Sequence, residues 1–434
     1  MESSNKYSTV HRILSDYNRA RKSASRKFSL KILKHLSSYQ FSIIYAKDYS
    51  ASNNIPSITL APETKLKLPG PEFADEKKYP VYTERDFILY HPEINASIYR
   101  DCVVTGGSTL IFSGNLAITP NSFDLTKYVT ALESSDLAEF RKQSSKFVFW
   151  GKPKKNPSGQ TAIRGINLIT EHAANYAHFI TEVLPRFTLI ESLPEFRDYS
   201  LILDSSTPKS FVQILKDSAT FPRTIHYVKK GERLNLRYCI NIEPTAFTPT
   251  HHRTTWRTGP IAPPSPHSHT FSKPALEYTR ERKLSSIIDS QTTSNDSSRL
   301  LLVRDKTSSY NSRYAVTWHQ IKDRFIKYGF QPYNPASDSF DKQVTRFSKA
   351  ELIAGEVGAA LVNSMFCAKP CTIWCLASYY ENADYYYFSN LAQLLGHTLV
   401  YFVGPRSISD TNKPKEVGTY WISPNCFDDF LARL

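Results

Sequence analysis

The segment from Arg299 to Asn363 constrains the fold more than any other part of the sequence, because short apolar runs alternate there with amphipathic stretches. The pattern predicts strand, helix, strand, helix, strand and helix in that order. Candidate N-caps support it, with Thr317 before one helix and Ser339 before the next. Strands that alternate with helices form parallel sheets, so the segment predicts an α/β domain.

Charged and small residues follow the predicted strands of this segment. Arg304 comes directly after the first strand, and a turn of mostly small residues, Gly355 to Ala360, follows the strand at residues 352–354. Unpaired N–H groups at such a helix start suit an anion, and ligands of open α/β sheets bind at the carboxyl ends of strands. The candidate ligand-binding residues are therefore Arg304, Arg313, Gly355, Glu356, Gly358, Ala359 and Asn363.

A second polar pattern runs from Asn175 to Arg186. On a helix, His178 and Glu182 would be neighbours, with Asn175 one turn back. Such a polar stripe is costly on an apolar helix unless it lines a cleft or is fully paired. The pair suits a general base with an orienting partner, with His178 as the favoured base and Glu182 as the alternative. The competing interpretation is a structural pair on a helix that Pro185 ends.

Both blocks resemble glycosyltransferase family 61, in the form found in bacteria. The family signature Asn-x-x-His-x-x-x-(Asp or Glu)-x-x-Pro-Arg matches residues 175–186. Its C-terminal pattern of two arginines, Ser-Phe-x-x-Gln-Val and a Gly-rich turn that ends in Asn matches Arg304, Arg313, residues 339–344 and residues 355–363.

This chain departs from the family pattern at two positions of the turn. Val357 stands where the family often has His or an aromatic residue, and Ala360 stands where it often has Gly. These departures keep open a non-catalytic glycan-binding or scaffold subunit on the same fold.

The resemblance implies a GT-B-like architecture, in which two Rossmann-like domains face a cleft. It implies sugar transfer from a nucleotide-activated donor to a hydroxyl of a glycan or lipid-linked glycan, in surface polysaccharide (capsule) biosynthesis. His178, Glu182 and Asn175 would be catalytic, and the Arg304 group would bind the donor. Because the chain has no convincing Asp-x-Asp pattern and arginines can stabilise a leaving phosphate, we expect an inverting reaction with neither metal nor cofactor.

Composition and patterning divide the chain into five parts. They are a basic helical extension and connector (1–80), an acceptor-side domain (81–257) that begins with a β-rich segment, a Pro-rich linker (258–274), a donor-nucleotide domain (275–408) and a tail (409–434). Within the β-rich segment, Val103 to Phe112 predicts a hairpin that turns at Gly106-Gly107.

The net charge of +14 indicates an anionic partner. Residues 1–36 are basic with two apolar stripes, which predicts either a helix on an anionic membrane surface or a helix packed on the protein body. A basic membrane or nucleic-acid adaptor is a third hypothesis, but no nucleic-acid-binding motif appears, so nucleic acid is not an expected partner. Without an apolar membrane span or signal-peptide core, the expected location is the cytoplasm, with peripheral binding to the inner face of the cytoplasmic membrane left open.

Three of the six cysteines, Cys367, Cys371 and Cys375, are spaced four residues apart. The spacing suggests a metal site, but Pro370 interrupts any helix that would align them and no His or Cys pair follows at a ligand spacing. Buried, reduced thiols are the prediction.

Overall fold

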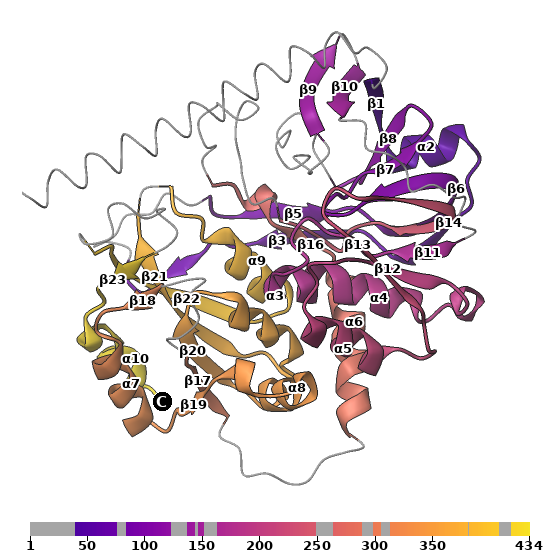
Figure 1. Ribbon diagram of the computed structural model, residues 1–434. Coiled ribbons are helices and arrows are strands. Elements are labelled where there is room, and N and C mark those ends of the chain that lie inside the picture. The colour runs from indigo at the N-terminus through magenta and orange to yellow at the C-terminus, as the bar shows by residue number, and fades with distance from the viewer. Residues whose placement is uncertain are drawn as a thin grey trace, which may run out of the picture.

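The computed structural model describes residues 40–75, 84–122, 137–143, 146–151, 163–248, 264–288, 298–304, 313–380, 382–407 and 418–434. Two large sheets with helices packed against them dominate these residues, which confirms the predicted α/β class (Figure 1). The predicted membrane-binding helix at 1–36 and linker residues 258–263 lie outside the described residues. Among the described residues, no helix combines the length and hydrophobicity needed to cross a bilayer.

The N-terminal sheet has eleven strands and a parallel half. Its parallel strands are, in spatial order, β13 (Ile225–Val228), β12 (Ser200–Asp204), β11 (Arg164–Asn167) and β14 (Arg233–Ile242). The chain passes from β11 outward through β12, α5 (Lys209–Ser218) and β13, then returns to the other side of β11 as β14. The strand order therefore reverses between β11 and β14, which creates a topological switch point.

The other half of this sheet is mostly antiparallel. It comprises β6 (Ile94–Thr105), β2 (Ser57–Ala61), β7 (Ile111–Ser113), β8 (Leu116–Thr119), β1 (Gln40–Tyr45), β10 (Lys146–Gly151) and β9 (Leu137–Gln143), with α2 (Ala46–Ser52) after β1. The predicted hairpin is present, since Val103 pairs with Phe112. Its loop spans residues 106–110 and is longer than the predicted Gly-Gly turn, with Gly107 at a φ of 74°.

The C-terminal sheet has six parallel strands. In spatial order they are β19 (Gln331–Tyr333), β17 (Arg299–Leu302), β20 (Leu352–Glu356), β21 (Thr372–Tyr379), β22 (Thr398–Pro405) and β4 (Glu72–Phe73). Helices α7 (Trp318–Lys327), α8 (Phe340–Ser348), η6 (Ala359–Phe366, a 3₁₀ helix) and α9 (Tyr386–Leu394) connect them. The strand order reverses between β17 and β20, so this sheet has its own switch point.

The helix starts predicted in this domain are confirmed, but one cap differs. The Ser339 side chain accepts a hydrogen bond from the Lys342 N–H and caps α8. Thr317 precedes α7, yet its hydroxyl donates to the carbonyl of Ile422 at 2.6 Å. Thr317 therefore joins α7 to the C-terminal segment instead of capping the helix.

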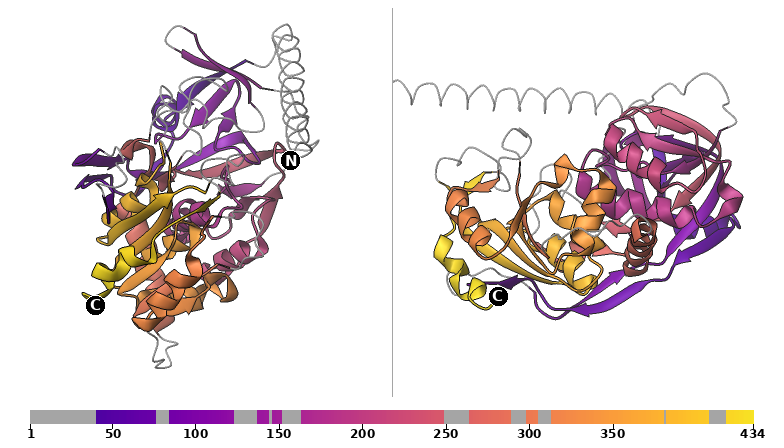
Figure 2. Two further views of the ribbon diagram at one scale, coloured as in Figure 1. Left: turned by 90° about the vertical axis from the view of Figure 1, so that its left-hand side faces the viewer. Right: turned by 90° about the horizontal axis from the view of Figure 1, so that it is seen from below.

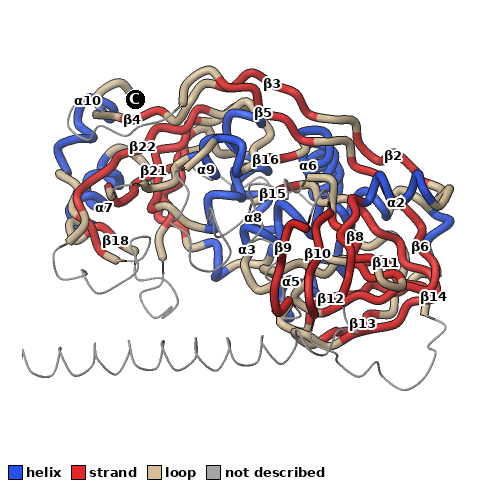
Figure 3. The backbone as a smooth tube through the Cα atoms, turned by 90° about the horizontal axis from the view of Figure 1, so that it is seen from above, coloured by secondary structure: helices blue, strands red, loops and turns tan. Residues whose placement is uncertain are grey.

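The chain crosses between the sheets near its N-terminus, which corrects the boundary predicted at residue 80. The predicted extension and connector contributes β1 and β2 to the first sheet and β4 to the second. A two-stranded ribbon of β3 (Thr64–Leu68) and β5 (Phe87–His91) runs along both units (Figures 2 and 3). A connector thus forms part of both sheets.

The predicted tail belongs to the C-terminal unit. It supplies β23 (Thr419–Tyr420), which pairs with β18 (Tyr314–Ala315), and α10 (Asp428–Leu431). Asp428 lies 2.5 Å from the guanidinium of Arg324 on α7, and Phe427 packs against Phe402.

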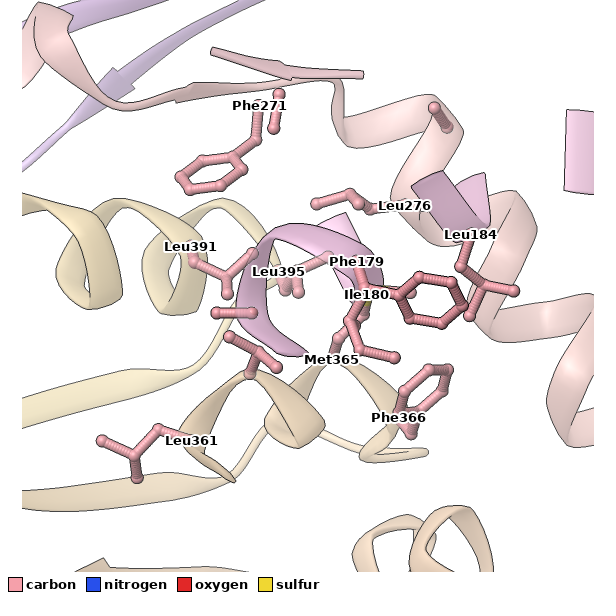
Figure 4. Close-up of a cluster of buried hydrophobic side chains, with 14 of the residues drawn as sticks. Phe179, Ile180, Leu184, Phe271, Leu276, Leu361, Met365, Phe366, Leu391 and Leu395 are labelled. Atoms are coloured by element: carbon pink, nitrogen blue, oxygen red, sulfur yellow. The ribbon is translucent and has the colours of Figure 1, made fainter. Parts of the chain in front are cut away.

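One apolar core joins the two units. The first-unit contribution is a continuous helical segment made of α3 (Tyr176–His178), the π-helix η2 (Phe179–Val183) and α4 (Leu184–Ile190). Phe179 and Ile180 lie close to Met365 and Phe366 of η6 (Figure 4). Helix α6 (Lys273–Ile288) contacts both α4 and α8. The joint between the units is therefore buried hydrophobic packing.

We expect Phe179→Ala to lower the free energy of unfolding by about 3–5 kcal/mol, because it leaves a cavity at this joint. Phe179 is fully buried and stacks on Phe211 at 4.7 Å. Denaturant unfolding measures the change, and Ile326→Ala on exposed α7 surface is the matched control, expected within about 0.5 kcal/mol of wild type. An equal loss in both variants would contradict a core at this place.

Candidate functional site

The carboxyl edge of the N-terminal sheet carries a pocket at the β11/β14 switch point. A segment after β11 and a segment after β14, which includes β15 (Ala246–Phe247), form its walls. The lining residues include Asn167, Thr170, His172, Glu182, Arg186, Asn241 and Thr248. Its volume is about 50 Å³, which accommodates a few water molecules or a hydroxyl group but not a whole sugar ring.

His178 and Glu182 form a buried pair at this pocket, as their spacing predicted. His178 Nδ1 lies 2.6 Å from Glu182 Oε1. The helix changes from α to π geometry between the two residues. Pro185 lies in the first turn of α4, so the helical segment continues past it and does not end there, contrary to what the interpretation of a structural pair predicted. Asn175 is the N-cap of α3 and accepts a hydrogen bond from the Ala177 N–H at 2.9 Å. Its side chain starts the helix instead of sharing the face of the pair.

Both carboxylate oxygens of Glu182 accept hydrogen bonds. Thr248 donates to Oε1 and Thr170 to Oε2, each at 2.8 Å. Burial alone would raise the pKa of Glu182, but the charge and hydrogen bond of His178, the nearby His172 and Thr248 together lower it to about 2. Glu182 is therefore an ionised acceptor across the neutral range, and the Nδ1–H of His178 is directed at it.

This geometry bears on which of the two residues could act as the base. With Nδ1–H donated to Glu182, the basic lone pair of a neutral His178 lies on Nε2. No partner for Nε2 occurs in the described part of the chain. Glu182, by contrast, has a depressed pKa and fully engaged oxygens. The arrangement has the pattern of a general base held in one tautomer by a carboxylate.

Several residues of this site carry no obvious signal in the sequence. The ring of His172 lies 4.5 Å from that of His178, and His172 lines the pocket. Arg186 is buried, and its Nε donates to the carbonyl of Glu182 at 2.8 Å. Its other nitrogens approach carbonyls of the loop after β11 at 3.4–3.5 Å. Arg186 thus connects the pocket wall to the helix that carries His178 and Glu182. Its position in the Pro-Arg signature was the one sequence feature that could have indicated a role in the site.

The predicted anion-binding residues lie mostly at the other switch point, where β17 and β20 end. Arg304 follows β17, and its guanidinium donates to the carbonyls of Arg313 at 3.2 Å, Glu356 at 3.4 Å and Val357. A Cβ atom at Gly358 would collide with this guanidinium. Three of the five N–H donors of Arg304 are used in these contacts, so donors remain for an anion. Arg313 is half-buried beside them.

Glu356 is buried at the same edge, and its carboxylate accepts the N–H of Ala315 at 2.7 Å. Burial raises its pKa to about 6, against the opposing effects of Arg304, Ala315 and Tyr420. Glu356 and Gly355 belong to strand β20, which corrects the predicted turn to Val357 and Gly358. At Gly355 an added Cβ would approach the Cβ of Leu302 to 2.8 Å, so glycine allows β17 and β20 to pack.

Ala359 begins η6, and Asn363 on the same helix lies away from the open edge. Asn363 is fully buried; its Oδ1 lies 2.7 Å from the hydroxyl of Tyr176, and its Nδ2 donates to Gln343 Oε1 at 3.0 Å. Tyr176 is two residues from His178. Burial raises the pKa of Tyr176, so its hydroxyl stays protonated and donates. The structure thus brings the sequence candidates together in two groups, one at each switch point, and Asn363 connects them.

Residues 176–374 match the family model described as Glycosyltransferase 61. The match contains His178, Glu182, Arg304 and Asn363. No curated protein matches the chain.

We expect Glu182→Gln to change how stability depends on pH. Glu182 has a folded-state pKa of about 2 against an ordinary value of 4.5, so its contribution is complete above pH 4.5 and is lost as pH falls toward 2. The shift corresponds to about 3 kcal/mol. Unfolding free energies between pH 5 and 3 should fall less steeply in Glu182→Gln than in wild type. The exposed Glu281→Gln should keep the wild-type slope; parallel slopes in all three proteins would refute the assignment.

Tyr176→Phe should destabilise the protein by about 1–3 kcal/mol, because it removes the donor of a buried hydrogen bond to Asn363. Chemical denaturation measures the loss. Tyr227→Phe removes a hydroxyl from an exposed side chain and should change stability by less than about 0.5 kcal/mol. If the two variants are equally stable, the hydrogen bond does not join the units.

Proposed function

Through residues 176–374 the chain belongs to glycosyltransferase family 61, and from its site we propose an inverting transfer of a sugar from a nucleotide-activated donor to a hydroxyl of a glycan acceptor. The hydrogen-bonded pair of His178 and Glu182 is the observation that carries the proposal. The family establishes glycosyl transfer; the direction of attack, the donor class and the residue roles are the proposed part.

In the proposed reaction, the acceptor hydroxyl enters the pocket after β11 and β14. His178 Nε2 takes its proton as the oxygen attacks the anomeric carbon of the donor. The bond from that carbon to the phosphate oxygen breaks, and the nucleoside phosphate leaves with the electron pair. Attack opposite the leaving group inverts the configuration. Glu182 fixes the imidazole and stabilises the imidazolium that forms.

The donor phosphates are proposed to bind where β17 and β20 end. Arg304 supplies positive charge and N–H donors, and the N–H groups at the start of η6 add further donors. Arg304 would stabilise the charge on the leaving phosphate, the role that a metal ion takes in other transferases. We therefore propose transfer without a metal or cofactor. Arg313 and Glu356 support the edge through their contacts with Arg304 and Ala315.

A GT-B-like arrangement follows as a proposal from the two switch points. Each sheet offers the edge at which ligands of α/β folds bind, and the Tyr176–Asn363 hydrogen bond joins α3 after one edge to η6 after the other. We propose that the donor and acceptor edges cooperate in one site. We propose as acceptor a glycan or lipid-linked glycan of surface polysaccharide (capsule) synthesis. The enzyme would reach it from the cytoplasm or the inner face of the cytoplasmic membrane, which suits a positively charged chain of this family.

His178→Asn should lower kcat by about 10²–10⁴ while nucleotide binding is retained, because its amide nitrogen takes the place of Nδ1 and can still donate to Glu182 but cannot take a proton. Turnover is measured as release of nucleoside phosphate from a panel of nucleotide-activated sugars with glycan acceptors. His319→Asn, at an exposed position on α7, is the control and should keep wild-type turnover. Full turnover in His178→Asn would exclude His178 as the base.

Arg304→Lys and Arg304→Ala should both lose the thermal stabilisation that a nucleoside mono- or diphosphate gives the wild-type protein. A ligand at 100 times its Kd stabilises by about 2.7 kcal/mol, which a thermal-shift panel without divalent metal detects. The Lys variant keeps the positive charge but loses the planar guanidinium donors, so it shows whether the charge alone is enough to bind the phosphate. Arg197→Ala, at an exposed arginine, should respond like wild type. A full nucleotide response in both Arg304 variants would contradict the proposed donor edge.

A further inference from the structure

A second group of chemically active side chains lies at the amino edge of the C-terminal sheet. Cys367 follows η6, Cys371 immediately precedes β21, and His397 immediately precedes β22. One ligand atom from each lies within 4.8 Å of the other two, and all three residues are buried. No sequence spacing links His397 to the cysteines, because the sheet brings His397 there from a separate loop.

The histidine is held in the tautomer that a metal ligand needs. His397 Nε2 lies 3.0 Å from the carbonyl of Ser364, to which only an N–H can donate. The lone pair is therefore on Nδ1, where it accepts the Cys371 N–H at 3.2 Å, a hydrogen bond that a coordinated ion would replace. A carbonyl acceptor behind the second ring nitrogen is the usual outer contact of a metal-bound histidine. Nδ1 faces the same side as the thiols.

The two cysteines stand at the ends of a short loop, with Cys367 after η6 and Cys371 before β21. Cys375, by contrast, is buried within β21 and is not a member of the group. The residues between the thiols, 368–370, are exposed and give an ion a path to the group.

We propose that Cys367, Cys371 and His397 form a structural site for one thiophilic divalent cation, with Zn²⁺ as the expected ion. Two thiolates and one imidazole neutralise the ion and match its preferred donors. Among the residues that the structure describes, no fourth His, Cys, Asp or Glu joins the group, so water completes a tetrahedron. Ligand atoms of a zinc site lie somewhat closer together than 4.8 Å, so the three side chains would move slightly toward one another when the ion binds.

The site is distinct from the proposed transfer chemistry. It lies at the amino ends of β21 and β22, whereas Arg304 and Glu356 lie at the carboxyl ends of β17 and β20. The ion would join the end of η6 to two strands of the sheet. Because η6 also carries Asn363, the site would hold the helix that connects the two units.

The test is cobalt and zinc binding by the full chain. Protein treated with a chelator and kept reduced is titrated with Co²⁺, and thiolate-to-cobalt charge-transfer absorption is recorded; bound zinc is counted by elemental analysis. We expect a band that saturates at one ion per chain, displacement by Zn²⁺, and a higher Tm with Zn²⁺. Cys371→Ser and Cys367→Ser should weaken binding by at least about 100-fold.

Cys426→Ser is the matched control, because Cys426 is exposed and outside the group, and it should bind like wild type. Circular dichroism shows whether each variant is folded, and the wild-type titration decides the question even if a serine variant is not. Absence of the band and of bound zinc in reduced wild type would overturn the proposal. So would loss of binding in Cys426→Ser, or a Cys367–Cys371 disulfide in protein that binds no metal after reduction.

Discussion

The hydrogen bond between Tyr176 and Asn363 is the contact on which the arrangement of the two units depends. Tyr176 begins the helix that carries His178, and Asn363 lies on the helix that follows the Gly358 turn. Asn363 is fully buried and Tyr176 is half-buried, so a shift of either helix would leave the Asn363 oxygen without its tyrosine donor. Apolar packing of Phe179 and Ile180 against η6 stabilises the joint, while the hydrogen bond fixes its register.

The joint has a functional consequence because it connects two switch points. In each sheet the strand order reverses beside the strand that leads into a candidate site, so backbone N–H groups and side chains gather at that edge. At the first edge Glu182, the hydrogen-bond partner of His178, lines a small pocket, and at the second edge an arginine lies over a glycine turn. The proposed sugar transfer needs both a proton acceptor and a stabilised leaving phosphate, and the proposal assigns one to each edge.

Much of this could be predicted from the sequence where local chemistry decides. Helical spacing placed His178 beside Glu182, and apolar runs located β17 and β20 with Arg304 after the first. Contacts between distant segments could not be read in the same way. The extension and connector at residues 1–80 supply strands to both sheets, Asn363 is a buried partner of Tyr176, and Thr317 bonds to Ile422. His172 and His397 reach their neighbours only through the tertiary fold.

The most direct measurement is an experimental structure of the protein with a bound nucleoside diphosphate. The account predicts phosphates in contact with the Arg304 guanidinium and with backbone N–H groups at the start of η6. The phosphate that bears the sugar in the donor should face the pocket of His178. A nucleotide bound instead within the β11/β14 pocket beside His172, with Arg304 uninvolved, would contradict the assignment of donor and acceptor edges.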